Sequence, residues 1–220
     1  MALVVTLLVL IGGAITLCVV WRVASLPCPW WLVPLLENPY FQVVAGAELL
    51  MNRAGIGPGM SVLDAGCGPG RMTVPISRRV GEAGRVVAFD LQPRMLRRLQ
   101  RRIADRGLAN VETVLGKLGD GRLPAAAFDV AVLVTVLGEI PDKLAALREI
   151  HRALRPGGVL SITEVLPDPH YQRVSRVRAL AAQAGFREAA RFGGWVSYTV
   201  NLSKPAAADS RAIGPQEGTR

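Results

Sequence analysis

The stretch VLDAGCGPG, residues 62–70, decides the fold of this 220-residue chain. It starts with a short apolar run of the kind that forms a buried β-strand, and three glycines follow. Glycine has no Cβ, so a glycine-rich turn between a strand and a helix lets a ligand approach the backbone closely. The stretch therefore predicts a strand, a ligand-binding turn and a helix, in that order.

Short apolar runs alternate with helical patterns around this turn. Strands are expected at 61–66, 85–91, 111–116, 128–137 and 159–166, and helices at 43–56, 71–80, 93–106, 142–155 and 170–184. Two last runs, 186–192 and 196–204, flank Gly193-Gly194 and indicate a hairpin. The alternation predicts an α/β, Rossmann-like domain whose seven-stranded sheet is mostly parallel, with an antiparallel strand at its edge.

The charges around the glycine turn distinguish between classes of ligand. A dinucleotide fingerprint reads G-x-G-x-x-G, whereas here the third glycine is Gly70 and Arg71 follows it. Asp64 stands two residues before the first glycine, where a carboxylate repels phosphate but attracts a cation or an amine. Asp90, at the end of the second strand, can take both hydroxyls of a ribose. The pattern favours a positively charged nucleoside without phosphates, such as S-adenosylmethionine (SAM), over nicotinamide or flavin cofactors.

On these residues the chain from about 45 to 204 resembles class I SAM-dependent methyltransferases, of the broad group that includes quinone and sterol methyltransferases. The matching features are VLDAGCGPG, the acidic end of VVAFD, the run FDVAVLVTVLGEIPD, and LRPGG before a strand. The resemblance implies a Rossmann-like methyltransferase domain over 43–204, with SAM as its cofactor and methyl transfer by direct displacement. These motifs are specific for the cofactor and leave the acceptor open.

The resemblance also implies which residues contact the cofactor. Asp64 and the backbone at Gly66 and Gly68 are expected to hold the methionine portion of SAM. Asp90 is expected to hold the ribose, and Leu91 is expected to lie beside the adenine.

One expected cofactor contact departs from the family pattern. Lys117 stands where the family often has an aspartate that bonds the adenine amine, so Asp120 or a backbone group is left to make that contact. Residues 135–137 are expected to line the methionine side. The complete expected set is Asp64, Gly66, Cys67, Gly68, Gly70, Asp90, Leu91, Lys117, Leu118 and Thr135.

Three side chains near the expected carboxyl ends of later strands are candidates for catalysis. Glu139 follows the fourth strand, at a place that in the family lies close to the transferred methyl group. The alternative interpretation is that Glu139 is a carboxylate at the start of the next helix, without a catalytic role. Glu164 ends the fifth strand, where it could orient substrate or act as a base, and its alternative is an exposed strand-end charge. His170 is a candidate because histidine is a common general acid and base, and the alternative interpretation is a surface histidine. With three cysteines and two histidines in the whole chain, no metal site is expected.

The N-terminal part of the chain differs sharply in composition. Residues 2–21 carry no charge, and as a helix they would span roughly 30 Å, the hydrocarbon thickness of a bilayer. Lys and Arg are absent before this run, which is unlike a cleaved signal peptide. The sequence predicts a transmembrane helix over 1–22 and a Trp/Pro-rich segment over 23–42 that lies at the bilayer interface. The alternative for the second segment is an apolar linker packed on the domain.

The net charge of +9 lies beyond residue 45, which predicts a single-pass protein with its catalytic domain in the cytoplasm. The arginine-rich helix over 94–106 is expected to contact anionic lipid headgroups, or else to be a solvated face. Nucleic acid is not an expected partner, because no aromatic platform interleaves these arginines. Residues 205–220 are expected to be a disordered tail.

A membrane location favours an acceptor that resides in the membrane. The expected function is therefore a membrane-anchored SAM-dependent methyltransferase whose acceptor is a quinone or isoprenoid, a phospholipid or another hydrophobic small molecule. Two alternatives remain at this point. One is a methyltransferase that acts on membrane proteins, and the other is a non-catalytic SAM-binding membrane scaffold.

Overall fold

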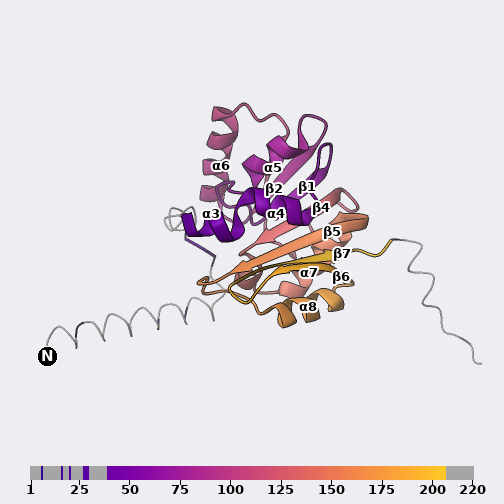
Figure 1. Ribbon diagram of the computed structural model, residues 1–220. Coiled ribbons are helices and arrows are strands. Elements are labelled where there is room, and N and C mark those ends of the chain that lie inside the picture. Colours follow the sequence, from indigo (N-terminus) through magenta and orange to yellow (C-terminus); the bar gives the residue numbers. More distant parts are fainter. Residues whose placement is uncertain (1–5, 7–15, 17–19, 21–26, 30–38, 207–220) are drawn as a thin grey trace, which may run out of the picture.

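A seven-stranded sheet forms the centre of the computed structural model, which describes residues 6, 16, 20, 27–29 and 39–206 (Figure 1). The strand order is β3-β2-β1-β4-β5-β7-β6, and only β7 runs antiparallel to its neighbours. The strands are β1 (Ser61–Ala65), β2 (Arg85–Asp90), β3 (Val111–Leu115), β4 (Phe128–Val134), β5 (Leu154–Val165), β6 (Arg187–Gly193) and β7 (Ser197–Ser203).

Helices cover both faces of the sheet (Figure 1). They are α3 (Pro39–Ala45), α4 (Ala47–Ala54), α5 (Thr73–Val80), α6 (Pro93–Asp105), the 3₁₀-helix η2 (Leu137–Glu139), α7 (Lys143–Ala153) and α8 (Val174–Gln183). α4, α5 and α6 lie on one face, and α7 and α8 lie on the other. The three-layer α/β architecture expected from the alternating pattern is confirmed.

The core consists of one apolar layer on each face of the sheet. Leu133 and Phe89 pack with Ile150 on the α7 side, and Met51 and Ile76 pack against the opposite face. All five residues of β1 are buried, because helices exclude water from both of its faces. Burial of each such large side chain contributes about 1.5–3 kcal/mol to the free energy of unfolding.

The prediction of an antiparallel strand at the sheet edge is wrong in one respect, because the antiparallel strand β7 is not at the edge. It lies between β5 and β6, and the edge strand β6 runs parallel to β5. The physical reason is burial, since both faces of β7 are apolar or small enough to be covered, whereas β6 carries Arg187, Glu188 and Arg191. The charged strand of the hairpin therefore takes the edge, where charges oppose pairing with another chain.

Two further local expectations differ from the structure. The single helix expected over 43–56 is broken at Gly46, where a Cβ would lie 2.3 Å from the Gln42 carbonyl oxygen. The helix expected over 142–155 is shorter than predicted. α7 ends at Ala153, Leu154 already belongs to β5, and the Gly157 N–H donates to the Lys204 carbonyl oxygen at 2.9 Å.

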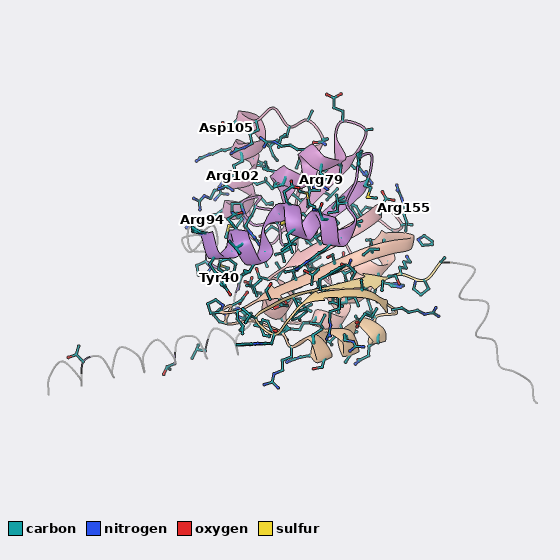
Figure 2. All side chains as sticks on the ribbon, in the orientation of Figure 1. Tyr40, Arg79, Arg94, Arg102, Asp105 and Arg155 are labelled. Atoms are coloured by element: carbon teal, nitrogen blue, oxygen red, sulfur yellow. The ribbon has the colours of Figure 1, made fainter. Side chains whose placement is uncertain are left out.

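The helix α6 is strongly two-sided, as its sequence indicates. Leu96 and Leu99 are buried against the sheet, while Arg94, Arg97 and Arg101 are exposed. Figure 2 shows Arg94 and Arg102 along the same helix, with Asp105 at its far end.

Several expectations concern the N-terminal segments and the tail. Among the described residues no helix is long and apolar enough to cross a membrane. Nearly all of the helix expected over 1–22, most of the interfacial segment expected over 23–42, and the tail from 207 onward lie outside the described residues.

Candidate active site

The candidate site lies where the parallel strands β1, β2 and β4 end. The strand order reverses on the two sides of β1, with β2 on one side and β4 on the other. In open α/β sheets this switch point leaves a crevice at the carboxyl ends of the strands, and ligands bind there. The glycine turn follows β1, Asp90 ends β2, and Thr135 follows β4, so the topology brings together three of the segments singled out from sequence.

The three glycines of the turn have positive φ angles but different roles. A Cβ on Gly66 would lie 2.5 Å from Val136 Cγ2, and one on Gly70 would lie 2.5 Å from Leu99 Cδ1. These two glycines let the turn pack closely against the β4 end and against α6. A Cβ on Gly68 would have no atom within 4 Å, so this is the glycine whose outer side is open to a ligand.

Asp90 ties the glycine turn to the end of β2. Its Oδ2 accepts the Gly68 N–H at 2.8 Å, and its Oδ1 accepts the Gln92 N–H at 2.7 Å. Burial raises the pKa of Asp90, while the N–H groups lower it. Each carboxylate oxygen retains a lone pair that can accept a ribose hydroxyl. The neighbouring Leu91 is 50% exposed, and its apolar surface beside Asp90 suits a planar base.

Asp64 and Cys67 are more deeply placed than Asp90. The Thr73 hydroxyl, at the start of α5, donates to Asp64 Oδ2 at 2.6 Å, and only 3% of Asp64 is exposed. Burial raises the pKa of Asp64 to about 6, against the lowering effects of Thr73 and Arg71. Cys67 packs with Leu99, and burial raises the pKa of its thiol. Asp64 therefore braces the turn from beneath, and Thr73 is a partner that the sequence analysis missed.

The loop after β3 is held by a residue that the sequence analysis also missed. The carboxylate of Glu149, buried in α7, accepts the N–H groups of Gly119 and Leu123. Leu118 is 7% exposed and belongs to the core, whereas Lys117 is exposed on the loop. The only sequence signal for Glu149 is an acidic residue among apolar ones in α7.

Thr135, the residue after β4, has an unusual backbone conformation. Its φ is +56°, a left-handed value that is rare for a β-branched residue. Its N–H donates to the Thr163 carbonyl oxygen at 2.8 Å, and its hydroxyl donates to the Val134 carbonyl oxygen at 2.7 Å. Such strain is sustained only where surrounding contacts impose it, and it is common at functional sites. Here it turns the chain so that Val136 packs against Gly66.

Glu139 lies beside a segment far away in sequence. Its Oε2 accepts the Cys28 N–H at 3.1 Å, and the Cys28 carbonyl oxygen accepts Gln92 Nε2 at 2.9 Å. The backbone of Cys28 thus bridges the ends of β2 and β4. Burial raises the pKa of Glu139 to about 8. The alternative interpretation, a carboxylate that starts the next helix, is wrong, because Asp142 caps α7 by accepting the Ala145 N–H at 2.9 Å.

Glu164 is not an exposed strand-end charge. It is 1% exposed, and its Oε2 accepts the Gln172 N–H at 3.0 Å. Within residues 39–206 and the other described positions, its Oε1 has no hydrogen-bond partner. Burial raises the pKa of Glu164 to about 8, and the charges of Asp168 and Glu139 raise it further. At neutral pH the native protein therefore favours the protonated acid.

His170 is buried rather than at the surface. It is 3% exposed, and its Nδ1 lies 3.9 Å from Asp168 Oδ1. Its backbone packs on Gly138, where a Cβ would lie 1.9 Å from the His170 carbonyl oxygen. The loops that carry Glu139 and His170 are therefore in direct contact, and the three catalytic candidates lie at one end of β4 and β5. Groups of acidic, histidine and cysteine residues able to hold a metal ion are absent from the described part of the chain.

Comparison with known proteins shows what this domain is similar to. Residues 62–158 match the protein-family model described as "Methyltransferase domain". The chain is 38% identical over 112 residues to nocamycin O-methyltransferase of Saccharothrix syringae, covering 51% of this chain and 40% of that protein. It is 37% identical over 118 residues to the ubiquinone/menaquinone biosynthesis C-methyltransferase UbiE of Shewanella sp. (strain ANA-3), covering 53% and 47%. The chain thus spans less than half the length of these curated relatives.

Solved structures share the fold. A SAM-dependent methyltransferase from Aquifex aeolicus superposes with a TM-score of 0.75 at 24% identity, covering 81% of this chain and all of that one. The [4+2]-cyclase SpnF superposes with a TM-score of 0.65 at 19% identity, covering 73% and 80%. Together these matches confirm the class I methyltransferase fold, and residues 62–158 match a methyltransferase domain, for which SAM is the expected cofactor. The open side of Gly68, the Asp90 carboxylate and the exposed Leu91 fit that cofactor.

Replacing Asp90 by Asn should weaken SAM binding about tenfold or more. The amide cannot accept both backbone N–H groups and two ribose hydroxyls, and loss of one charge-assisted bond costs about 1.5–3 kcal/mol. Isothermal titration with SAM measures the effect. Asp105→Asn, at an exposed position on α6, is the matched control. Unchanged SAM affinity in the Asp90 variant would show that this carboxylate does not hold the cofactor.

Replacing Glu164 by Gln should stabilise the protein above pH 6. The native carboxyl has a pKa of about 8, above its unfolded value of 4.5, so the wild type loses stability as pH rises from about 4.5 to 8. Gln stays neutral and keeps an acceptor for the Gln172 N–H. Urea unfolding at pH 5 and pH 7.5 should give a variant-minus-wild-type difference that grows by at least about 1 kcal/mol at the higher pH. Glu112→Gln, which is exposed, should show no such growth, and an equal difference at both pH values would contradict the assignment.

Proposed function

We propose that the chain is a SAM-dependent methyltransferase whose acceptor is a hydrophobic small molecule of quinone-like type, bound beside Glu139. One observation carries the proposal: the cofactor-type groups at β1 and β2 adjoin buried carboxyl groups at β4 and β5. The relatives that match this part of the chain support the acceptor class. They include UbiE and the demethylmenaquinone methyltransferase of Geobacillus stearothermophilus, which is 31% identical over 110 residues.

Methyl transfer requires little of the protein beyond alignment of the acceptor atom with the methyl group and a group that accepts a proton. The acceptor atom forms a bond to the methyl carbon as the carbon–sulfur bond breaks, the electron pair stays on sulfur, and a carboxylate takes any proton lost by the acceptor. Asp90 and the glycine turn fix one end of the reacting pair. Glu139, half-buried beside the β4 end, is the group that would receive the proton.

We also propose that residues 2–21 anchor the domain to a membrane, with the domain on the cytoplasmic side. Support comes from the uncharged run in the sequence and from the surplus of basic residues beyond it. The exposed arginines of α6 are available to anionic headgroups, at about 1 kcal/mol each near a surface. An anchored domain would meet a hydrophobic acceptor where that acceptor is concentrated.

Two other functions fit the same sequence. A methyltransferase that modifies membrane proteins would use the same anchor and cofactor. The second alternative function is that of a SAM-binding protein that transfers no methyl group. The cyclase SpnF shows that this fold also occurs in a protein named for a different reaction.

Methyl-labelled SAM incubated with the full chain and membranes of its source should place label in the organic extract. The Asp90→Asn variant should reduce that label at least fivefold. Label confined to precipitated protein would favour the membrane-protein substrate instead. Absence of label in both fractions, with SAM binding intact, would favour the binding protein.

A shortened chain tests the anchor in the same assay. Removal of residues 1–26 leaves Cys28 and the buried Phe41 of α3 in place, so the domain's own contacts are kept. If the shortened chain labels an acceptor in membranes as fast as the full chain does, residues 1–26 do not serve access to the acceptor.

Replacing Glu139 by Gln should remove a pH dependence from the rate. If Glu139 takes a proton from the acceptor, kcat/KM of the wild type should rise with pH up to about 8, because only the ionised form accepts a proton. The variant should be at least tenfold slower at pH 8 and flat across this range. Glu112→Gln should keep the wild-type profile, and a wild-type profile in Glu139→Gln would remove Glu139 from this role.

A further inference from the structure

A cavity of about 710 Å³ lies next to the catalytic candidates and is used by none of the groups assigned to the cofactor. It is bounded by the loop from Leu166 to Val174, which follows β5, and by the turn of the β6–β7 hairpin. Its volume falls in the range of about 300–1,000 Å³ that is typical of small-molecule sites. The residues used below are Asp168, Tyr171, Arg173, Arg191, Trp195 and Tyr198.

Aromatic side chains form part of the cavity wall. The Tyr171 and Tyr198 rings meet edge to face, with their centroids 5.8 Å apart. Both hydroxyls are already engaged, since Tyr171 donates to the Trp195 carbonyl oxygen at 2.8 Å and Tyr198 donates to the Gln172 carbonyl oxygen at 2.6 Å. The rings are thereby fixed in orientation and offer apolar surface. The Trp195 side chain is 78% exposed, an unusual position for so large an apolar group.

Two of the residues that line the cavity are arginines, which carry positive charge. Arg173 precedes α8, and Arg191 lies on β6, so the two come from different elements. Neither guanidinium has an ion-pair partner within the described part of the chain. Guanidinium groups bind carboxylates in a two-pronged geometry and stack on aromatic faces. Asp168 is the one acidic residue among those that line the cavity.

Asp168 also connects the cavity with the reacting end of the site. Its charge raises the pKa of both Glu139 and Glu164, so it lies within electrostatic reach of each. Glu164 also pairs directly with Tyr198 across β5 and β7. A molecule in the cavity would therefore have one end near the buried carboxyl groups and the other near the arginines.

We propose that this cavity is the acceptor site and that it takes a planar aromatic molecule bearing an acidic group. The ring would lie against Tyr171 and Trp195, and the acidic group would pair with Arg173 and Arg191. The inference rests on the proposed function, and it narrows the quinone-like acceptor to one whose planar ring carries an acidic group. It assigns Arg173 and Arg191 as the residues that determine specificity.

A matched pair of probes tests this assignment by binding alone. 2-Naphthoate and 2-naphthamide share one ring system and differ in charge, and both are titrated into the full chain with S-adenosylhomocysteine present. Naphthoate should bind about tenfold more tightly than the amide, the ratio expected for one charge-assisted pair. Arg173→Gln and Arg191→Gln should each reduce this ratio at least threefold, while Arg187→Gln, exposed on the same β6 strand but outside the cavity, should leave it unchanged.

A further variant separates the contribution of the aromatic ring to probe affinity from that of the charge. Trp195→Ala should weaken both probes by a similar factor, and because the side chain is exposed, folding should not suffer. Equal affinity for the two probes, no detectable binding of either, or a ratio insensitive to both arginines would overturn the proposal. Methyl transfer and SAM affinity, measured on the same preparations, report on the proposed function separately. Charge selectivity that depends on the arginines would support the cavity assignment even if no methyl transfer is found.

Discussion

The hydrogen bond from the Gly68 N–H to the Asp90 carboxylate fixes the turn on which the rest of the site depends. The N–H groups of Gly66 and Cys67 add two bonds to the Phe89 carbonyl oxygen, at 2.7 and 3.1 Å, so the turn is joined to β2 by three hydrogen bonds in all. These bonds fix the turn after β1 against the end of β2, and in this arrangement the outer side of Gly68 stays open. They also orient Leu91, the next residue, beside the same carboxylate. One buried carboxylate thus fixes the backbone of the turn and keeps lone pairs that can accept from a ligand.

Most of the fold could be predicted because its signals are local. Each parallel strand is a short apolar run, and each helix repeats apolar residues along one face. Both patterns can be recognised in the sequence without knowledge of distant contacts. The β6–β7 hairpin was also visible, but not which of its strands pairs with β5. That choice depends on which strand can be buried on both faces, and the charged residues of β6 decide it. The break at Gly46 was missed because the apolar helical pattern continues across it, although glycine is a poor helix former.

The candidate site could be predicted only in part, for a physical reason. Asp64 and the glycines stand at the end of β1 and Asp90 at the end of β2, so their spacing along the chain identifies them. Thr73 lies nine positions from its partner Asp64, whereas Glu149 and Cys28 act through bonds to groups farther away in sequence, and the bond between Cys28 and Glu139 joins residues 111 positions apart. No local pattern contains such a pairing. The burial of Glu164 and His170 likewise follows from how the loop after β5 folds back over Gly138.

The bridge made by Cys28 has a mechanical consequence for the whole domain. Cys28, one of the few described residues before α3, is joined through its backbone to Gln92 and Glu139, at the ends of two central strands. A force applied to the chain before Cys28 is therefore borne first by these two hydrogen bonds. The load would reach the sheet at its carboxyl edge, the side that carries Asp90 and the glycine turn.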